Sequence, residues 1–180
     1  MQARTATLWD RFSGAELRLC HAANGICRWP GTRAVFAAVS RLGNGVFWYT
    51  LMVMLPLVYG PEALRTSLHM LAVSGVCLLL YKLIKPRAAR PRPCAASTGI
   101  DLGAAPLDLY SFPSGHTLHA VAFSLVACAH HPELSVVLVP FTVLVALSRV
   151  VLGLHYPTDV AVGALLGALV AALGLQLTEL

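Results

Sequence analysis

The sequence predicts an all-α fold, a polytopic transmembrane helical bundle of about five spans preceded by an N-terminal amphipathic interfacial helix. Of the 180 residues, 57% are hydrophobic and only 12% are charged, and the mean hydropathy is +0.72. Soluble domains average about 45–50% apolar and about 25% charged residues. A chain of this length forms one domain, and a soluble domain of this size could not bury so much apolar surface.

Residues 1–33 predict an amphipathic leader, and residues 34–180 a transmembrane domain. Basic and apolar side chains recur on different sides of a leader helix: Arg4, Arg11 and Arg18 on one, and Leu8, Phe12, Ala15 and Leu19 on the other. Such a helix is suited to lying in the headgroup region of a membrane. No continuous apolar segment precedes Arg33, so a signal peptide is not expected.

Five apolar runs predict the membrane-spanning helices. They cover residues 35 or 46 to 59, 66–84, 114–130, 134–152 and 160–177. Crossing a hydrocarbon core of about 30 Å takes about 20 apolar residues, and only a helix satisfies its own backbone there. The start of the first run stays open because Arg41 and the Gly-Asn-Gly sequence at 43–45 interrupt it. Gly163 and Gly167 predict close packing of another helix against the last run.

Three short motifs at the ends of these runs contain the chemically active residues. The first is Lys85 with Arg92-Pro93, the second is Pro113-Ser114-Gly115-His116, and the third is Ser148-Arg149 with His155 and Asp159. Counting the crossings places all three motifs on the same side of the membrane. The sequence therefore predicts one shared site at one end of the bundle.

Lys85, Arg92 and Arg149 predict that this site binds an anion. No cluster of carboxylates is expected near them to neutralise their charge, and such a trio suits a phosphate dianion, with forked contacts from arginine and a point charge from lysine. Ser114 and Gly115 stand at a predicted helix N-terminus, where backbone N–H groups and the helix dipole also favour an anion.

His155 and Asp159 predict the reactive pair of the site. A carboxylate that orients an imidazole makes it a nucleophile or base, and His116 remains free to donate a proton to a leaving oxygen. His119, one helical turn after His116, could face the same site. Each residue alone has an ordinary structural explanation, such as an interfacial anchor or an acidic residue in the first turn of a helix. Their combination at converging helix ends favours a catalytic site.

The remaining composition excludes other classes of function. The net charge of +5 is concentrated at the ends of apolar runs, which fits a membrane surface or an anionic ligand better than nucleic acid. The five cysteines are an odd number and imply no disulfide framework. Cys20 and Cys27 are spaced more widely than usual zinc ligands, so no metal site is predicted.

The three motifs resemble the signature of the type 2 phosphatidic acid phosphatase (PAP2) family, K-x6-R-P, then P-S-G-H, then S-R-x5-H-x3-D. Every signature position is present and in order: Lys85, Arg92, Pro93, Pro113, Ser114, Gly115, His116, Ser148, Arg149, His155 and Asp159. The resemblance covers roughly residues 66–178 and leaves the first 45 residues outside. Many membrane members of the family look six-spanned, whereas this sequence predicts five spans and a leader.

The resemblance implies a helical-bundle membrane enzyme that removes phosphate from lipid phosphates or diphosphates without a metal or other cofactor. It implies that His155 attacks phosphorus to form a phosphohistidine while Asp159 holds its imidazole. His116 would protonate the departing lipid oxygen and later help to activate water. The implied phosphate-binding residues are Lys85, Arg92, Ser114, Gly115 and Arg149.

The sequence leaves the lipid open among phosphatidate, phosphatidylglycerol phosphate and a polyprenyl phosphate or diphosphate. We expect residues 94–112 to decide among them. The alternative function is a membrane transporter or channel with a buried His/Asp proton relay, which would not need three clustered cations. The expected partners are a lipid phosphate and the bilayer, without nucleic acid, and the oligomeric state is not predicted.

The predicted location is the inner membrane of a bacterium, crossed several times by the chain. Six arginines precede or begin the first span: Arg4, Arg11, Arg18, Arg28, Arg33 and Arg41. Because basic residues favour the cytoplasmic side, we expect the N-terminus inside. With five crossings in all, two precede the first motif and four precede the last, so the site shares the side of the N-terminus and is expected at the cytoplasmic face.

Overall fold

The computed structural model describes residues 8–106 and 108–178, and this part of the chain is helical and contains no strand. Its α-helices are α1 (Leu8–Asn24), α2 (Pro30–Arg41), α3 (Phe47–Tyr59), α4 (Leu64–Ala88), α5 (Pro93–Ala96), α6 (Gly115–His130), α7 (Ser135–Val151) and α8 (Pro157–Thr178). The predicted all-α fold is confirmed.

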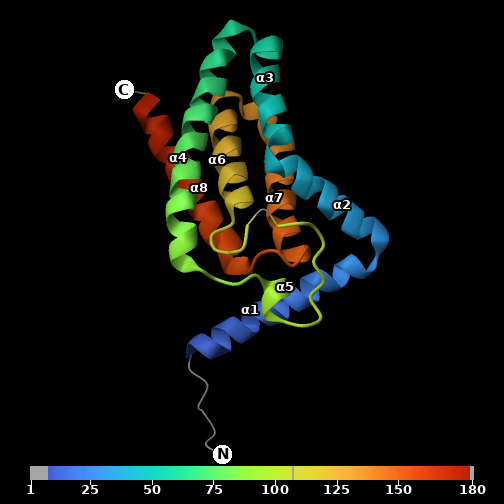
Figure 1. Cartoon of the computed structure of the whole chain (residues 1–180). Helices are drawn as coiled ribbons and strands as arrows, with labels where there is room; N and C mark the ends of the chain where they lie inside the picture. The colour runs from blue at the N-terminus through green and yellow to red at the C-terminus, as the bar shows by residue number, and fades with distance from the viewer. Residues whose placement is uncertain (1–7, 107, 179–180) are drawn as a thin grey trace, which may run out of the picture.

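The helices form a membrane bundle with α6 among them (Figure 1). Four segments are long and apolar enough to cross a membrane: Pro30–Tyr59, Pro61–Ala96, Pro132–Val151 and Pro157–Leu177. The shorter α6, with 16 residues, packs against α4, α7 and α8. These four segments, together with the shorter α6, are roughly consistent with the five predicted spans. Helix α1, α5 and the loop before α6 lie at one end, and the end of α8 lies towards the other.

The first span begins earlier than either predicted start, at Pro30, because it contains both α2 and α3, which follow each other across a break. At the break Asn44 leaves helical geometry and Gly45 has a φ of +116°, a conformation that glycine adopts at little cost. Gly43 is buried against Val145 of α7 and has no room for a side chain, since a Cβ there would lie 2.8 Å from a Val145 methyl. The interruption that obscured this span in the sequence is therefore a kink that lets it pack on α7.

Helices α6 and α8 pack with their backbones in close approach, as the two glycines of α8 predict. A Cβ on Gly163 would lie 2.6 Å from the Ser114 carbonyl oxygen, and one on Gly167 would lie 2.3 Å from that of Leu118. Neither position can accept a larger residue without separating the helices. This contact joins the start of α6, at Ser114, to the first turns of α8.

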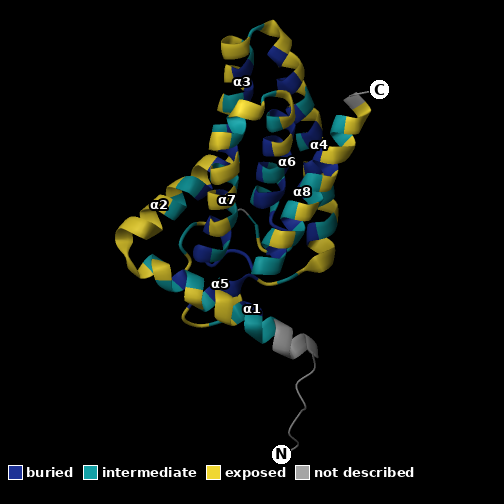
Figure 2. Ribbon diagram, turned by 180° about the vertical axis from the view of Figure 1, so that it is seen from behind, coloured by how far each residue is buried: buried dark blue, intermediate teal, exposed yellow. Residues whose placement is uncertain are grey.

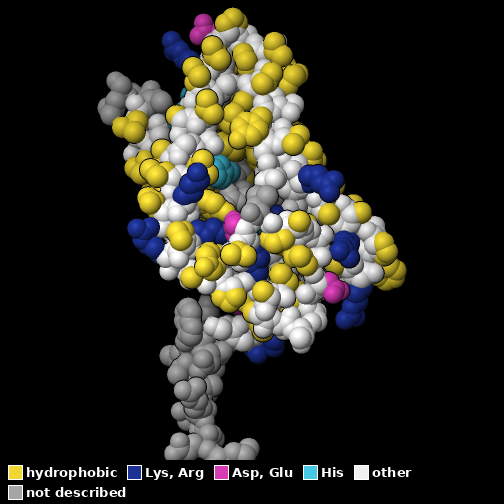
Figure 3. All heavy atoms as spheres, viewed as in Figure 1, with side chains coloured by type: hydrophobic (Ala, Val, Ile, Leu, Met, Phe, Trp, Pro, Cys, Tyr) yellow, Lys and Arg dark blue, Asp and Glu magenta, His cyan; other side chains and the backbone are white. Residues whose placement is uncertain are grey.

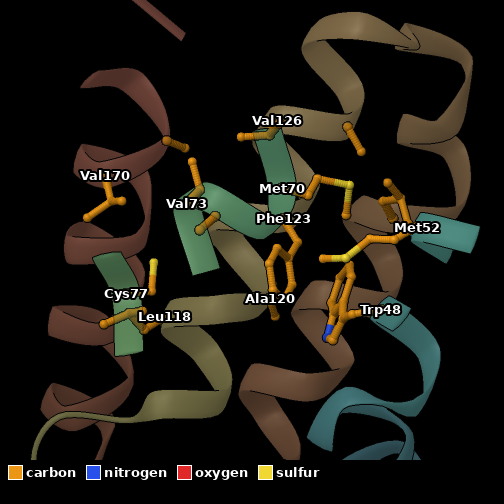
Figure 4. Close-up of a cluster of buried hydrophobic side chains, with 14 of the residues drawn as sticks. Trp48, Met52, Met70, Val73, Cys77, Leu118, Ala120, Phe123, Val126 and Val170 are labelled. Atoms are coloured by element: carbon orange, nitrogen blue, oxygen red, sulfur yellow. The ribbon is translucent and has the colours of Figure 1, made fainter. Parts of the chain in front are cut away.

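The core lies around α6, and the outer faces of the bundle are apolar. Buried side chains from α3, α4, α6 and α8 meet in the cluster of Figure 4, which includes Trp48, Met70, Leu118, Phe123 and Val170. Exposed residues follow the outward faces in Figure 2, and hydrophobic side chains cover much of the surface in Figure 3. Large exposed apolar patches mark a membrane-contacting surface, which fits a multi-pass integral protein.

Helix α1 packs against α7 and α8 at the end of the bundle where the three sequence motifs lie. Its buried face contains Glu16, Cys20 and Asn24, whereas Arg18 and Leu19 are exposed. Asn24 donates hydrogen bonds to the carbonyl oxygens of Asp101 (2.9 Å) and Val151 (3.0 Å). The predicted pattern also used Arg4, Leu8, Arg11 and Phe12, whose side chains lie outside the described part. The described half of α1 is thus held by polar contacts to the bundle.

Candidate active site

The three motifs meet at one end of the bundle. Lys85 lies in the last turn of α4, and Arg149 lies in the last turn of α7. Arg92 and Ser114 are the N-cap residues of α5 and α6. His155 lies between α7 and α8, and Asp159 lies in the first turn of α8. All six side chains are buried, with Asp159 fully inaccessible and His155 2% exposed. Gly115 and His116 are half-buried beside them. Residues up to 74 positions apart are thereby assembled into one polar cluster.

The cations of the cluster lie close enough for their charges to interact. Both Arg92 and Arg149 act electrostatically on Lys85. Arg92 is fixed by a hydrogen bond from Nη1 to the Leu154 carbonyl oxygen (2.7 Å), and Arg149 donates to the Ser40 hydroxyl from α2. Among the described residues, the buried Arg149 Nε has no hydrogen-bond partner. Buried cations with donors to spare favour an anionic ligand.

A single carboxylate, which the sequence did not indicate, pairs with two of these cations. Asp108, from the long loop before α6, lies 2.7 Å from Lys85 Nζ and 2.8 Å from Arg92 Nη2, and it accepts a hydrogen bond from Tyr81. Although burial opposes its charge, the hydrogen bonds from Lys85 and Tyr81 hold the pKa of Asp108 below its usual range. The path of the loop in the folded chain brings Asp108 to these cations, and no local sequence pattern indicated this contact.

Tyr81 is a further site residue, and the sequence did contain a signal for it. It lies four residues before Lys85 on the same face of α4, and its hydroxyl accepts a hydrogen bond from Lys85 Nζ (2.9 Å). Its ring also lies over Gly115, where a Cβ would come within 2.7 Å of Tyr81 Cε2. Gly115 therefore lets the start of α6 lie directly against this ring.

The two ring nitrogens of His155 face different groups. Nε2 accepts from Arg92 Nη1 at 3.3 Å, and Nδ1 lies 3.7 Å from Asp159 Oδ2. Because Nε2 acts as acceptor, the proton of the neutral ring belongs on Nδ1, towards Asp159. Burial lowers the pKa of His155 to about 4; Asp159 opposes this change, and Arg149 and Arg92 add to it. The imidazole is thus neutral at pH 7, with its unprotonated nitrogen towards the cations.

Asp159 is held by contacts from several elements. Its Oδ2 accepts from the Tyr156 backbone N–H (2.8 Å), and its Oδ1 accepts from Arg90 Nη1 (2.7 Å). Arg90 also binds Glu16 of α1 (2.7 Å). The sequence interpretation assigned no role to Arg90 or Glu16, and the 74-residue separation between them left no local pattern from which to infer one.

The start of α6 joins the cluster to a neighbouring cavity. Ser114 caps the helix by accepting from the Thr117 N–H, and its own N–H donates to the Asp159 carbonyl oxygen (3.0 Å). His116 lies within electrostatic range of Arg149 and His155. It lines a cavity of about 230 Å³ between the α2–α3 break, α4 and α6. His119 lines the same cavity, so it does face this region.

Similar proteins are known for most of the chain. Residues 65–179 match the PAP2 superfamily. Decaprenylphosphoryl-5-phosphoribose phosphatase of Mycobacterium tuberculosis is 36% identical over 80% of this chain and 79% of its own length. Phosphatidylglycerophosphatase B of Bacillus subtilis is 33% identical over 80% of this chain and 74% of its own.

A solved structure extends the similarity to the whole bundle. The crystal structure of the transmembrane PAP2-type phosphatidylglycerolphosphate phosphatase from Bacillus subtilis has a TM-score of 0.75 and 30% identity. It covers 94% of this chain and 87% of its own. The match therefore includes helices before residue 65, where the sequence motifs gave no information. With the complete signature assembled at one end of a bundle of this shape, the chain belongs to the PAP2 superfamily.

Proposed function

We propose that this membrane phosphatase of the PAP2 superfamily hydrolyses a lipid phosphate or diphosphate through a phosphohistidine on His155. The observation that carries the proposal is the orientation of that imidazole. Nε2 is turned towards Arg92, at 3.3 Å, and Nδ1 towards Asp159, at 3.7 Å. A neutral ring backed by a carboxylate and facing a cation cluster is arranged as a nucleophile for a phosphoryl group.

In the first step, His155 Nε2 attacks the terminal phosphorus, and the bond from that phosphorus to the leaving oxygen breaks; this oxygen belongs to the alcohol of a monophosphate or bridges the two phosphorus atoms of a diphosphate. Asp159 stabilises the imidazolium that develops, and His116 gives its proton to the departing oxygen. In the second step water attacks phosphorus, and His116 takes a proton from that water. The bond from phosphorus to His155 breaks, which releases inorganic phosphate and restores the neutral imidazole. The half-buried position of His116 on the cavity supports its role at the leaving group.

Lys85, Arg92 and Arg149 bind the phosphoryl oxygens in this proposal, together with the start of α6 at Ser114 and Gly115. Phosphoryl transfer depends mainly on positioning and on stabilising negative charge. Three buried cations of the chain itself supply that charge, so the mechanism uses no metal or other cofactor. Asp108, which now contacts two of them, gives way to the phosphoryl group when substrate binds.

The cavity beside His116 supports a lipid leaving group. It is lined by the apolar side chains of Trp48, Leu78 and Phe123 as well as by polar atoms of the site. A lipid alcohol that leaves towards His116 would enter this apolar space. The alternative of a transporter or channel is not favoured, because the relatives are phosphatases.

The relatives indicate which lipids to assay first. Decaprenylphosphoryl-5-phosphoribose comes from the name of the Mycobacterium tuberculosis relative, and phosphatidylglycerol phosphate from that of the Bacillus subtilis relative. Phosphatidate and a polyprenyl diphosphate complete the panel. The proposal covers the phosphoryl group and the lipid character of the leaving group, which all four lipids share.

The test is phosphate release from this panel in detergent with a chelator, using the wild type, His155→Ala and His69→Ala. His69 contacts His130 at the other end of the bundle, so its variant controls for loss of a histidine. We expect chelator-resistant release from at least one lipid, lost in His155→Ala and retained in His69→Ala. Brief reaction with ³²P-lipid should label the wild type at His155. Release that persists in His155→Ala would overturn the mechanism.

A further inference from the structure

A buried chain of charges connects α1 to the catalytic carboxylate. Glu16 is only 4% exposed, although it is ionisable and lies on a helix at the end of the bundle. Its Oε2 accepts from Arg90 Nη2 at 2.7 Å. Its Oε1 accepts from the Thr158 N–H at 2.9 Å and from the Thr158 hydroxyl at 2.6 Å. A carboxylate is buried at such cost only when its charge and both oxygens are satisfied.

Arg90 is shared between two carboxylates. Its Nη2 binds Glu16, and its Nη1 binds Asp159 Oδ1 at 2.7 Å and the Thr158 hydroxyl at 2.8 Å. The guanidinium also lies 3.8 Å from the centre of the Tyr156 ring, which holds its plane by a cation–π contact. A planar fork suits this task because it addresses two acceptors in fixed directions.

The contact with Arg90 fixes the direction of the Asp159 carboxylate. Oδ1 is taken by Arg90, and Oδ2 therefore points to the Tyr156 N–H and to His155 Nδ1. Glu16 in turn sets how strongly the positive charge of Arg90 offsets the negative charge of Asp159. With Glu16 ionised, the guanidinium interacts with both carboxylates, so Asp159 still presents enough negative charge to stabilise an imidazolium.

We propose that Glu16 and Arg90 are positioning residues that hold Asp159 in orientation and charge for its action on His155. Helix α1 lies outside the three motifs, but through Glu16 it contributes to the positioning of Asp159. The proposal rests on the phosphohistidine mechanism above. Neither residue touches the phosphoryl group in this scheme, and their effect passes through Asp159. Partners in the outer shell of a site commonly change activity by 10–100-fold when removed.

The first test is Glu16→Gln, with Glu62→Gln as the matched control. The two changes are chemically identical, and Glu62 is exposed at the opposite end of the bundle. A glutamine at 16 can still accept from Thr158, but it presents no charge to Arg90. We expect kcat, measured on folded monodisperse protein, to fall about 10–100-fold with KM changed less than about threefold. Glu62→Gln should match the wild type.

The second test separates positioning from mere attachment of α1. Charged or titratable groups from several elements act on His155 and Asp159: Arg92, His116 and Arg149 on His155, and Cys20, Arg90 and Tyr156 on Asp159. Variants of Arg90 change only the charge that faces Asp159. In Arg90→Gln the negative charge of Asp159 is no longer offset, so it favours the imidazolium form of His155. The pH below which kcat/KM falls, the acid limb of its pH profile, should therefore rise by about half a unit or more. Arg90→Lys keeps the charge and should keep the limb near its wild-type pH, with kcat still lowered.

The outcomes distinguish this inference from the proposed function. If kcat and the pH profile of Glu16→Gln and Arg90→Gln equal those of the wild type, the positioning role is overturned while the histidine mechanism stands. If both variants lose activity only in proportion to unfolded protein, the role is again overturned. Activity that survives His155→Ala would instead remove the mechanism on which the inference rests. Loss of kcat together with an upward shift of the limb in Arg90→Gln supports it.

Discussion

The carboxylate of Asp108 lies 2.7 Å from the ammonium group of Lys85, where the proposed mechanism requires an oxygen of the phosphoryl group. The same carboxylate reaches Arg92 at 2.8 Å. A carboxylate and a phosphate present similar oxygens to these cations, so Asp108 competes with the substrate for the pocket. It also explains how buried cations are tolerated before substrate binds.

Asp108→Asn should therefore strengthen binding of phosphate-like anions. Removing a full negative charge at contact distance is expected to lower the inhibition constant for vanadate about tenfold, equivalent to about 1.4 kcal/mol. The measurement is inhibition of phosphate release by vanadate. Asp101→Asn is the control, because Asp101 lies exposed in the same loop. An unchanged or weaker inhibition in Asp108→Asn would contradict the competition.

Gly115→Ala should damage the site although it adds one methyl group. A Cβ at 115 would lie 2.7 Å from Tyr81 Cε2, so either the ring or the start of α6 must shift. Tyr81 contacts both Lys85 and Asp108, and we expect kcat/KM to fall about tenfold, since overpacking costs about 1–3 kcal/mol. Gly75→Ala is the control, because nothing lies within 4 Å of its added Cβ. Equal kcat/KM in the two variants would show that this close approach is unimportant.

The pH dependence should reflect a His155 that stays neutral in mild acid. Burial lowers its pKa to about 4, and the neutral ring is the nucleophile. As pH falls through 6.5, an ordinary histidine would become charged and inactive, but this one should lose activity only as pH approaches 4. The check is kcat/KM from pH 4 to 8, corrected for ionisation of the lipid phosphate by titrating the lipid alone. A corrected limb near pH 6.5 would refute the prediction.

The orientation in the membrane can be tested with engineered cysteines. We propose that the leader arginines hold the N-terminus, and with it the site, at the cytoplasmic face. Thr98 is exposed in the loop that follows α5, at the end of the bundle that contains the site, and Glu62 is exposed at the opposite end. In intact cells a membrane-impermeant maleimide should label Glu62→Cys but spare Thr98→Cys. Labelling of Thr98→Cys from outside would place the site at the outer face.

The spans, and the meeting of the three motifs at one end of the bundle, could be predicted because their signals are local. Apolar runs of sufficient length indicate membrane helices, and Ser114-Gly115 after Pro113 indicates a helix start. The break at 43–45 was visible as an interruption, but its consequence was not. Whether Gly45 ends a helix or kinks it depends on the packing of Gly43 against Val145, and that contact is about a hundred residues away in the chain.

The sequence by itself determined that this chain spans a membrane, and it predicted that Lys85, Arg92, His116, Arg149 and His155 would come together at one end of the bundle, where the structure places them. Hydropathy adds up residue by residue, and the motif spacings place those residues at helix ends. Only the tertiary structure decided which carboxylates meet them: Asp108 at Lys85, and Glu16 at Arg90. Those ion pairs join α1, the long loop and α8. Burial forces each charge to find a partner, but the path of the chain decides which partner is within reach.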